Sequence, residues 1–120
     1  MRPNTRACIA YVAVRLVTGR NALSVYDYSQ SKHILVSGTV EESRIQIYDH
    51  DRGCEFSGNR NGDKFSLHHY GDSHFVDLFL DATKFKGYDY GTSSPFYGEV
   101  TGKSIRVYDY RESSFFNYSI

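Results

Sequence analysis

A pattern that returns about every 20 residues is the strongest constraint on how this chain folds. The segment IRVYDYRES at residues 105–113 has close relatives beginning at Leu23, Ile45 and Phe85, and a more divergent copy, FSLHHYGDS, begins at Phe65. The central residue of each copy, here called the anchor, is Asp27, Asp49, His69, Asp89 or Asp109, at spacings of 22, 20, 20 and 20 residues. These recurrences indicate one supersecondary unit repeated five times.

The residues around each anchor alternate as they do in a β-strand. Positions four before, two before and seven after the anchor are nearly always apolar, and Tyr or His flanks every anchor. Since alternate residues of a strand share a face, Ile105, Val107 and the anchor should point toward a core, with Arg106 and Tyr108 pointing away. A turn follows each anchor, and Ser or Gly stands four residues after it. An Asp or Ser side chain can hydrogen-bond backbone N–H groups there, so we predict that the anchor caps the turn.

Residues 4–19 follow a different period. Asn4 or Thr5 offers an N-cap, and Gly19 is a natural C-terminal stop. Apolar side chains recur between them at helical spacing, at Cys8, Ile9, Val12 and Leu16. We predict one amphipathic helix, with an extra strand over IAYVAVRLV as the alternative because valine favours strands.

Composition favours strands in the rest of the chain. The sequence has 11 Tyr, 8 Phe and 10 Gly but only 2 Pro, and aromatic residues with frequent turns are typical of β-structure. A length of 120 residues suits one domain that buries roughly two thirds of its unfolded surface. We therefore expect a single all-β repeat domain over 1–120, with an N-terminal capping helix in 1–20 and five β repeats in 21–120.

Two arrangements fit a β repeat of this length. In a β-solenoid each copy is one coil, equivalent residues stack about 4.8 Å apart, and the helix closes the N-terminal end. In an antiparallel hairpin meander or barrel, each copy is a hairpin that turns once after the anchor and again at NGD or TGK. Stacked aspartates repel each other in the solenoid, whereas hairpins separate them by two strand spacings. The sequence leaves both open, and we take the solenoid as the first expectation.

Charge and cysteine content restrict the partners and the location. Lys plus Arg number 14 and Asp plus Glu number 14, so net charge gives no general attraction to nucleic acid or an anionic membrane. The apolar run ACIAYVAV is too short to span a membrane, and Arg15 interrupts its continuation toward a signal peptide. Cys8 and Cys54 have no metal or redox spacing. We expect a cytoplasmic protein with reduced thiols and no membrane or nucleic-acid partner, although the two cysteines could in principle pair.

The face opposite the aliphatic positions is the candidate binding surface. Tyrosine presents a flat apolar ring and a hydroxyl, and Lys or Arg adds attraction for anions, so this face suits a carbohydrate or another polymer. The candidate ligand-binding residues are Tyr28, Tyr48, Tyr70, Tyr88, Tyr90, Tyr108, Tyr110, Lys86 and Arg106. The alternative is a plain strand surface, where Tyr, Lys and Arg are common because they tolerate partial exposure.

Catalytic and metal-binding motifs are lacking in the sequence. It has no nucleophile elbow, phosphate-binding glycine loop or zinc-protease helix motif. His68, His69, Asp72 and His74 have the side-chain types of metal ligands, but the strand pattern puts His68 and His69 on opposite faces. We expect no enzymatic activity, no catalytic residues, no metal site and no cofactor.

The end of the chain suggests self-association. SSFFNYSI completes the fifth copy without a polar segment after it, and an uncapped apolar array end favours pairing. We therefore expect a homodimer through this end. The leading functional hypothesis is a non-enzymatic binding or interaction module; the alternative is a structural, self-assembling repeat protein with no small-molecule ligand.

Overall fold

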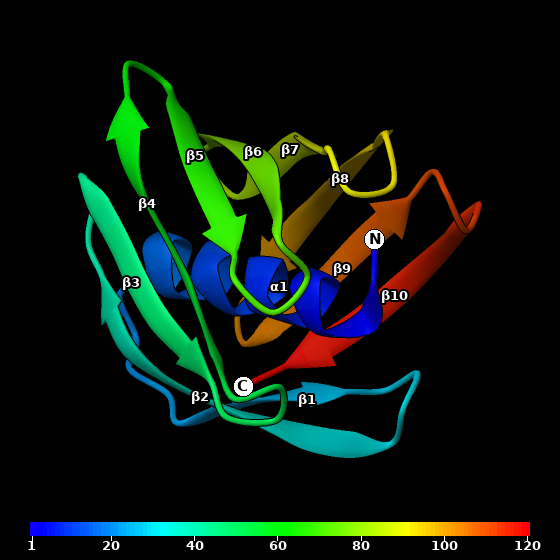
Figure 1. The fold of residues 1–120 in the computed structure, drawn as a ribbon. Helices are drawn as coiled ribbons and strands as arrows, with labels where there is room; N and C mark the ends of the chain where they lie inside the picture. Colours follow the sequence, from blue (N-terminus) through cyan, green and yellow to red (C-terminus); the bar gives the residue numbers. More distant parts are fainter.

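The computed structural model describes residues 1–120 as a closed ten-stranded β-barrel around one helix (Figure 1). The helix is α1 (Pro3–Thr18). The strands are β1 (Ser24–Asp27), β2 (Lys32–Val40), β3 (Arg44–Asp49), β4 (Cys54–Asn61), β5 (Lys64–His69), β6 (His74–Asp81), β7 (Lys84–Asp89), β8 (Ser94–Thr101), β9 (Ser104–Asp109) and β10 (Ser114–Ser119). The expectation of a mostly β fold with one N-terminal helix is confirmed.

The sheet is an antiparallel meander closed between its first and last strands. Every strand pairs with its neighbours in sequence, and β1 pairs with β10 through Tyr26 opposite Ser119 and Asp27 opposite Tyr118. The solenoid expectation is therefore wrong, and the meander or barrel alternative fits. The physical reason lies in the connections, because loops of two to four residues can join antiparallel strands but are too short for a parallel crossover.

Closure also changes the basis for the expected homodimer. β10 hydrogen-bonds to β9 on one side and to β1 on the other, so the array has no free terminal strand. The unpaired edge on which that expectation depended is absent from this fold, and the oligomeric state stays a prediction.

The alternation predicted around the anchors is confirmed. Ile105, Val107 and Asp109 are buried on the inner face of β9, while Arg106 is exposed and Tyr108 is half-buried on the outer face. All five anchors end the odd-numbered strands and are fully buried. Leu23 departs from the pattern, because it precedes β1 and is 74% exposed.

The anchors cap their turns as predicted. Asp49 Oδ1 accepts hydrogen bonds from the backbone N–H groups of Asp51 at 3.0 Å and Arg52 at 3.1 Å. Each of the other anchors also accepts a backbone N–H from the turn that follows it. The repeat therefore uses a buried polar side chain to hold each hairpin turn in place.

Helix α1 lies inside the barrel, and every residue from Ala7 to Val14 is completely buried. The prediction of a helix over residues 4–19 is confirmed within a residue at each end, and the strand alternative is wrong. Two details are corrected. The helix begins at Pro3 without a side-chain N-cap from Asn4 or Thr5, and it fills the barrel instead of capping an end. Residues 7–14 of this helix, ACIAYVAV, are apolar on all sides, and a helical segment of this kind is typically buried, whereas a single apolar stripe is typical of a surface helix.

Ten strands leave room for this helix and its side chains. An α-helix with side chains is about 10–12 Å across, and barrel diameter grows with strand number. The small residues Ala7, Ala10 and Ala13 let the helix pack closely against the wall, and its C-terminus is formed by Gly19 in a left-handed conformation.

With 16 residues, the helix is shorter than the hydrocarbon thickness of a bilayer requires, and no helix in the structure could span a membrane.

Candidate functional site

The anchors meet the N-terminal half of α1 in a buried polar layer. Arg6 donates to Asp109 Oδ2 at 3.0 Å and to the Tyr118 hydroxyl at 2.9 Å, and its guanidinium lies 3.4 Å from the centroid of the Phe116 ring. The backbone nitrogen of Met1 also lies 2.7 Å from Asp109 Oδ2. On the opposite side, Thr5 donates to Asp72 Oδ2 at 2.7 Å. These contacts fix the position of the helix along and around the barrel axis.

Cys8, Asp49 and His69 form the closest group of reactive side chains in this layer, here called the Cys8 cluster. All three are fully buried, and one donor atom from each lies within 4.8 Å of the others. Cys8 Sγ is 3.9 Å and His69 Nε2 is 3.4 Å from Asp49 Oδ2. The Asp72 backbone N–H donates to His69 Nδ1 at 3.0 Å, so the hydrogen-bond network assigns the imidazole proton to Nε2.

The protonation of the cluster follows from burial and hydrogen bonding. Burial, reinforced by the negative charge of Asp49, raises the pKa of the Cys8 thiol well above its usual value. Burial also raises the pKa of Asp49, but hydrogen bonds from His69, the Arg52 backbone and Asn4 outweigh it and leave that pKa below its usual value. At neutral pH Cys8 is therefore a thiol and Asp49 a carboxylate.

Cys54 borders this cluster but lacks the geometry of a nucleophile. Its Sγ is 3.7 Å from His69 Nε2 and 3.9 Å from Nδ1, so the sulfur is not directed at the lone pair of either nitrogen. Burial raises the pKa of this thiol too, which disfavours the thiolate. A catalytic Cys–His pair needs a hydrogen bond that lets imidazole remove the thiol proton. The arrangement gives no support to cysteine catalysis.

The histidines near β5 and β6 separate as the strand pattern indicated. His69 points into the barrel, and His68 lies on the outer face against Phe75, with ring centroids 4.5 Å apart. His74 Nε2 lies 2.9 Å from the anchor Asp89, whereas His69 Nδ1 lies 3.6 Å from Asp72 Oδ2. These four residues do not form a shared site.

The predicted ligand-binding residues all lie on the outer surface but not in one place. Tyr28, Tyr48, Tyr70, Tyr90 and Tyr110 are each between 42% and 58% exposed and are spread around the barrel with the odd-numbered strands. Closure of the sheet distributes residues that a flat sheet would keep on one side. Six of them belong to β7, to β9 or to the first residue after these strands, which flank β8: Lys86, Tyr88, Tyr90, Arg106, Tyr108 and Tyr110.

Several of these tyrosines have local structural partners. The aromatic side chains that flank each anchor form an edge-on pair, with ring centroids 4.5–4.9 Å apart in all five copies. Tyr90 also donates its hydroxyl to Asp77 Oδ2 at 2.8 Å, and Tyr28 is 3.3 Å from the Ser119 hydroxyl across the closing seam. Aromatic pairs of this kind stabilise the strands that carry them.

A continuous line of side chains crosses the outer face of β6–β10. In strand register Phe79 is opposite Lys86, Lys86 opposite Tyr97, Tyr97 opposite Tyr108, and Tyr108 opposite Phe115. We call these five residues the outer row. With strands about 4.8 Å apart, it extends roughly 19 Å across the barrel. Phe79, Tyr97 and Phe115 are not among the residues predicted from the sequence, because their positions are not aromatic in most other copies.

The outer row presents stacked and exposed rings. Tyr97 stacks on Tyr108 with centroids 5.3 Å apart and 24° between the planes, and Phe115 meets Tyr108 edge-on at 4.8 Å. Tyr97 is 40% and Phe115 is 44% exposed. Arg106 lies 4.6 Å from the centroid of Phe115. The aromatic faces therefore remain accessible beside a cation.

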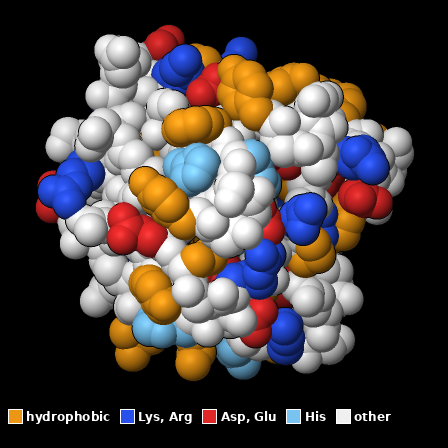
Figure 2. Space-filling model, in the orientation of Figure 1, with side chains coloured by type: hydrophobic (Ala, Val, Ile, Leu, Met, Phe, Trp, Pro, Cys, Tyr) orange, Lys and Arg blue, Asp and Glu red, His pale blue; other side chains and the backbone are white.

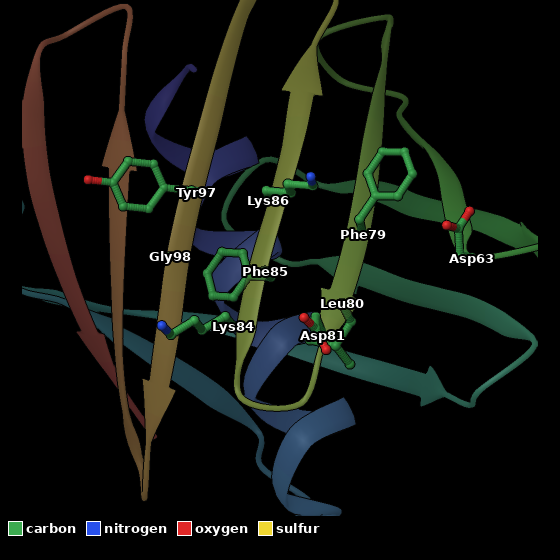
Figure 3. Close-up of a pocket in the computed structure, with 9 residues that line it drawn as sticks. All are labelled: Asp63, Phe79, Leu80, Asp81, Lys84, Phe85, Lys86, Tyr97 and Gly98. Atoms are coloured by element: carbon green, nitrogen blue, oxygen red, sulfur yellow. The ribbon is translucent and has the colours of Figure 1, made fainter.

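A surface hollow of about 740 Å³ adjoins this row. Phe79, Lys86 and Tyr97 extend from three neighbouring strands at its rim, and Lys84 and Asp81 lie at its lower edge (Figure 3). Charges alternate beside the row in a second register line that runs Asp81, Lys84, Glu99, Arg106 and Asn117. This second line thus offers hydrogen-bond donors and acceptors, and its two positive charges equal its two negative charges.

Mixed charge is also the character of the face seen in Figure 2. Acidic and basic side chains are interspersed there, with hydrophobic side chains between them and no large area of one sign.

Comparisons with protein-family models, with curated proteins and with solved structures found no match for this chain.

Proposed function

We propose that this protein is a non-enzymatic binding module and that its outer row binds a neutral glycan. The observation that carries the proposal is the exposed ring of Tyr97, which stacks on the half-buried Tyr108, together with the exposed Phe115 on the neighbouring strand. Flat aromatic faces pack against the apolar faces of sugar rings. A row of about 19 Å is long enough to contact several sugar units in line.

The charges beside the row favour a neutral ligand. In strand register Lys84 lies between Asp81 and Glu99, and Glu99 lies between Lys84 and Arg106, so two carboxylates balance these two cations locally. A nucleic acid or an anionic polysaccharide would need an uncompensated basic strip. Sugar hydroxyls both donate and accept hydrogen bonds. Alternating carboxylate, ammonium, guanidinium and amide groups can therefore bind them.

The experiment is binding by calorimetry to cellohexaose, maltohexaose and chitohexaose, with heparin and oligo(dT) as charged probes. We expect binding to at least one neutral oligosaccharide. Tyr97→Ser should weaken it about tenfold or more, which is about 1.4 kcal/mol. Tyr48→Ser is the matched control, because Tyr48 is 42% exposed on β3, away from the row. Binding confined to the charged probes, or equal losses in both variants, would contradict the proposal.

A structural protein without a ligand is the second candidate. The five edge-on aromatic pairs beside the anchors favour it, since they give the repeated tyrosines a role within their own hairpins. In that case no oligosaccharide should bind, and Tyr108→Ser should lower stability while Tyr97→Ser has little effect. Oligosaccharide binding by the unaltered protein, together with the stabilities of Tyr97→Ser and Tyr108→Ser, therefore separates the two functions.

A further inference from the structure

The Cys8 cluster combines three kinds of metal-ligand side chain from three separate elements. Cys8 lies in the middle of α1, Asp49 ends β3 and His69 ends β5. Their donor atoms converge within 4.8 Å in a fully buried layer. Neither the anchor hydrogen bonds nor the packing of the helix requires a thiol at this point, since the other anchors are held without one.

The distances match those of a tetrahedral metal site. With metal–sulfur bonds near 2.3 Å and metal–nitrogen or metal–oxygen bonds near 2.0 Å, neighbouring ligand atoms lie about 3.3 Å apart for N and O and about 3.5 Å apart when one is S. Here His69 Nε2 to Asp49 Oδ2 is 3.4 Å and Cys8 Sγ to Asp49 Oδ2 is 3.9 Å. The third separation, from Cys8 Sγ to the imidazole nitrogen, is within 4.8 Å, so shifts of up to about one ångström would place all three donors around one ion.

Cys54 is placed to supply the fourth ligand. Its Sγ is already 3.7 Å from His69 Nε2, close to the separation of two ligands on one metal. It begins β4 and is half-buried at the end of the barrel, so this position also gives an ion access from solvent. A small rotation of the Cys54 side chain would turn the sulfur toward the cluster.

Surrounding groups orient the carboxylate. Asp49 Oδ1 is held by backbone N–H groups of Asp51 and Arg52, which leaves Oδ2 facing Cys8 and His69. The Asn4 amide also donates to Oδ2 at 3.1 Å. Outer groups that orient a ligand in this way are typical of metal sites in proteins.

The imidazole must change tautomer to bind a metal through Nε2. The proton then belongs on Nδ1, which costs the hydrogen bond from the Asp72 backbone N–H. The Asp72 carboxylate lies 3.6 Å from Nδ1 and can accept the proton instead, forming a carboxylate–histidine–metal arrangement. Loss of one neutral hydrogen bond is small beside the free energy of metal coordination.

We propose that Cys8, Asp49 and His69, completed by Cys54, bind a divalent transition metal ion, with zinc as the natural candidate. A thiolate and an imidazole favour zinc over magnesium or calcium, which prefer oxygen ligands. Cys8 and Cys54 bind the ion as thiolates, so the two positive charges of the ion replace two thiol protons and the net charge of the buried layer does not change. Binding releases both thiol protons to solvent.

The test is a cobalt titration of reduced, chelator-treated protein, followed by zinc displacement. Tetrahedral Co²⁺ bound to thiolate gives visible absorption bands and a near-ultraviolet sulfur-to-metal charge-transfer band. We expect these to saturate at one equivalent and to disappear on addition of zinc. Cys8→Ser should weaken cobalt binding by about 100-fold or more, because replacing a residue that only hydrogen-bonds to a metal ligand already lowers metal affinity by about 10–100-fold. Asp89→Asn, at an anchor outside the cluster, should leave the spectrum unchanged.

Two results would overturn the proposal. One is the absence of the tetrahedral thiolate spectrum in the unaltered protein, a result that does not depend on the folding of any variant. The other is a spectrum that persists in both Cys8→Ser and Asp49→Asn, or one without charge-transfer intensity, as expected for binding by surface histidines only. Cys54→Ser should retain binding with reduced charge-transfer absorption, which separates the fourth ligand from the other three.

Discussion

Backbone conformation at single residues explains part of the repeat. The residue four positions after each anchor has positive φ: it is Gly53 in one copy and Ser31, Ser73, Ser93 or Ser113 in the others, with φ between 52° and 66°. The sequence analysis assigned these serines to hydrogen bonding of turn N–H groups. The structure shows a conformational role instead, since Ser73 and Ser113 direct their hydroxyls at carbonyls about 3.5 Å away.

The second set of hairpin turns also requires positive φ. Gly62 and Gly102 occupy the first position of two-residue loops with φ of 69° and 60°, and Ala82 occupies the equivalent position between β6 and β7 with φ 55°. Glycine is favoured at this position, and a Cβ there costs about 1–2 kcal/mol. Ala82 is therefore a strained residue in an exposed turn.

Ala82→Gly should stabilise the protein. Relief of the strain exceeds the added entropy of the unfolded chain, so we expect the free energy of unfolding to rise by about 0.5–1 kcal/mol in urea denaturation. Thr83→Gly, at the next position and without positive φ, is the control and should lower it by a similar amount. If both glycines destabilise equally, the turn conformation assigned here is wrong.

At the scale of elements, α1 is tied to the barrel wall through polar contacts at its N-terminal end. Thr5 donates to Asp72 Oδ2 at 2.7 Å, and Arg52 binds Oδ1 of the same carboxylate. Burial alone would raise the pKa of Asp72, but hydrogen bonds from Thr5 and Arg52 and the nearby charges lower it. Because the folded pKa lies below the unfolded value of about 3.9, this contact stabilises the fold above that pH and is lost as the pH falls through the folded pKa.

Thr5→Val tests this link between helix and sheet. The variant removes the hydrogen bond, so at pH 7 we expect a loss of about 1–3 kcal/mol in the free energy of unfolding. The difference from the unaltered protein should shrink as the pH is lowered from 5 to 2.5, since protonation removes the charged acceptor. Thr18→Val is the control, because Thr18 bonds only the Val14 carbonyl, at 2.6 Å, and the nitrogen of Arg20. A Thr5→Val deficit that is the same at both pH values would exclude the assigned role of the Asp72 charge.

The elements also show which parts of the structure were accessible from the sequence. Strand faces, capped turns and the bounds of α1 could be predicted because each depends on residues near one another in the chain. The position of α1 inside the barrel could not, because it depends on whether β1 meets β10. The Cys8 cluster was missed for the same reason: Cys8 lies 41 residues before Asp49 in the sequence, and only the enclosed helix brings them together. The outer row was missed because Tyr97 and Phe115 lie on even-numbered strands, where the equivalent positions of most other copies are not aromatic.

At the scale of the whole molecule, closure of the sheet positions both proposed sites. It curves the outer face, so that β6–β10 carry the outer row while Tyr28 and Tyr48 lie elsewhere. It also encloses α1, which brings Cys8 against two anchors. An open meander with the same hairpins would retain the aromatic pairs and the capped turns but would expose residues 7–14 of α1, which are apolar on every side.

Disulfide trapping across the β1–β10 seam tests closure most directly. Tyr26 and Ser119 are paired partners on the outer face, and paired antiparallel residues have Cα atoms about 5.5 Å apart, within the range that a disulfide spans. In a Cys54→Ser background, Tyr26→Cys with Ser119→Cys should form an intramolecular disulfide at monomer mass on mild oxidation, whereas Tyr26→Cys with Ser66→Cys, on distant strands, should not. Free thiols in the first pair, or only disulfide-linked dimers, would show that the sheet does not close around α1.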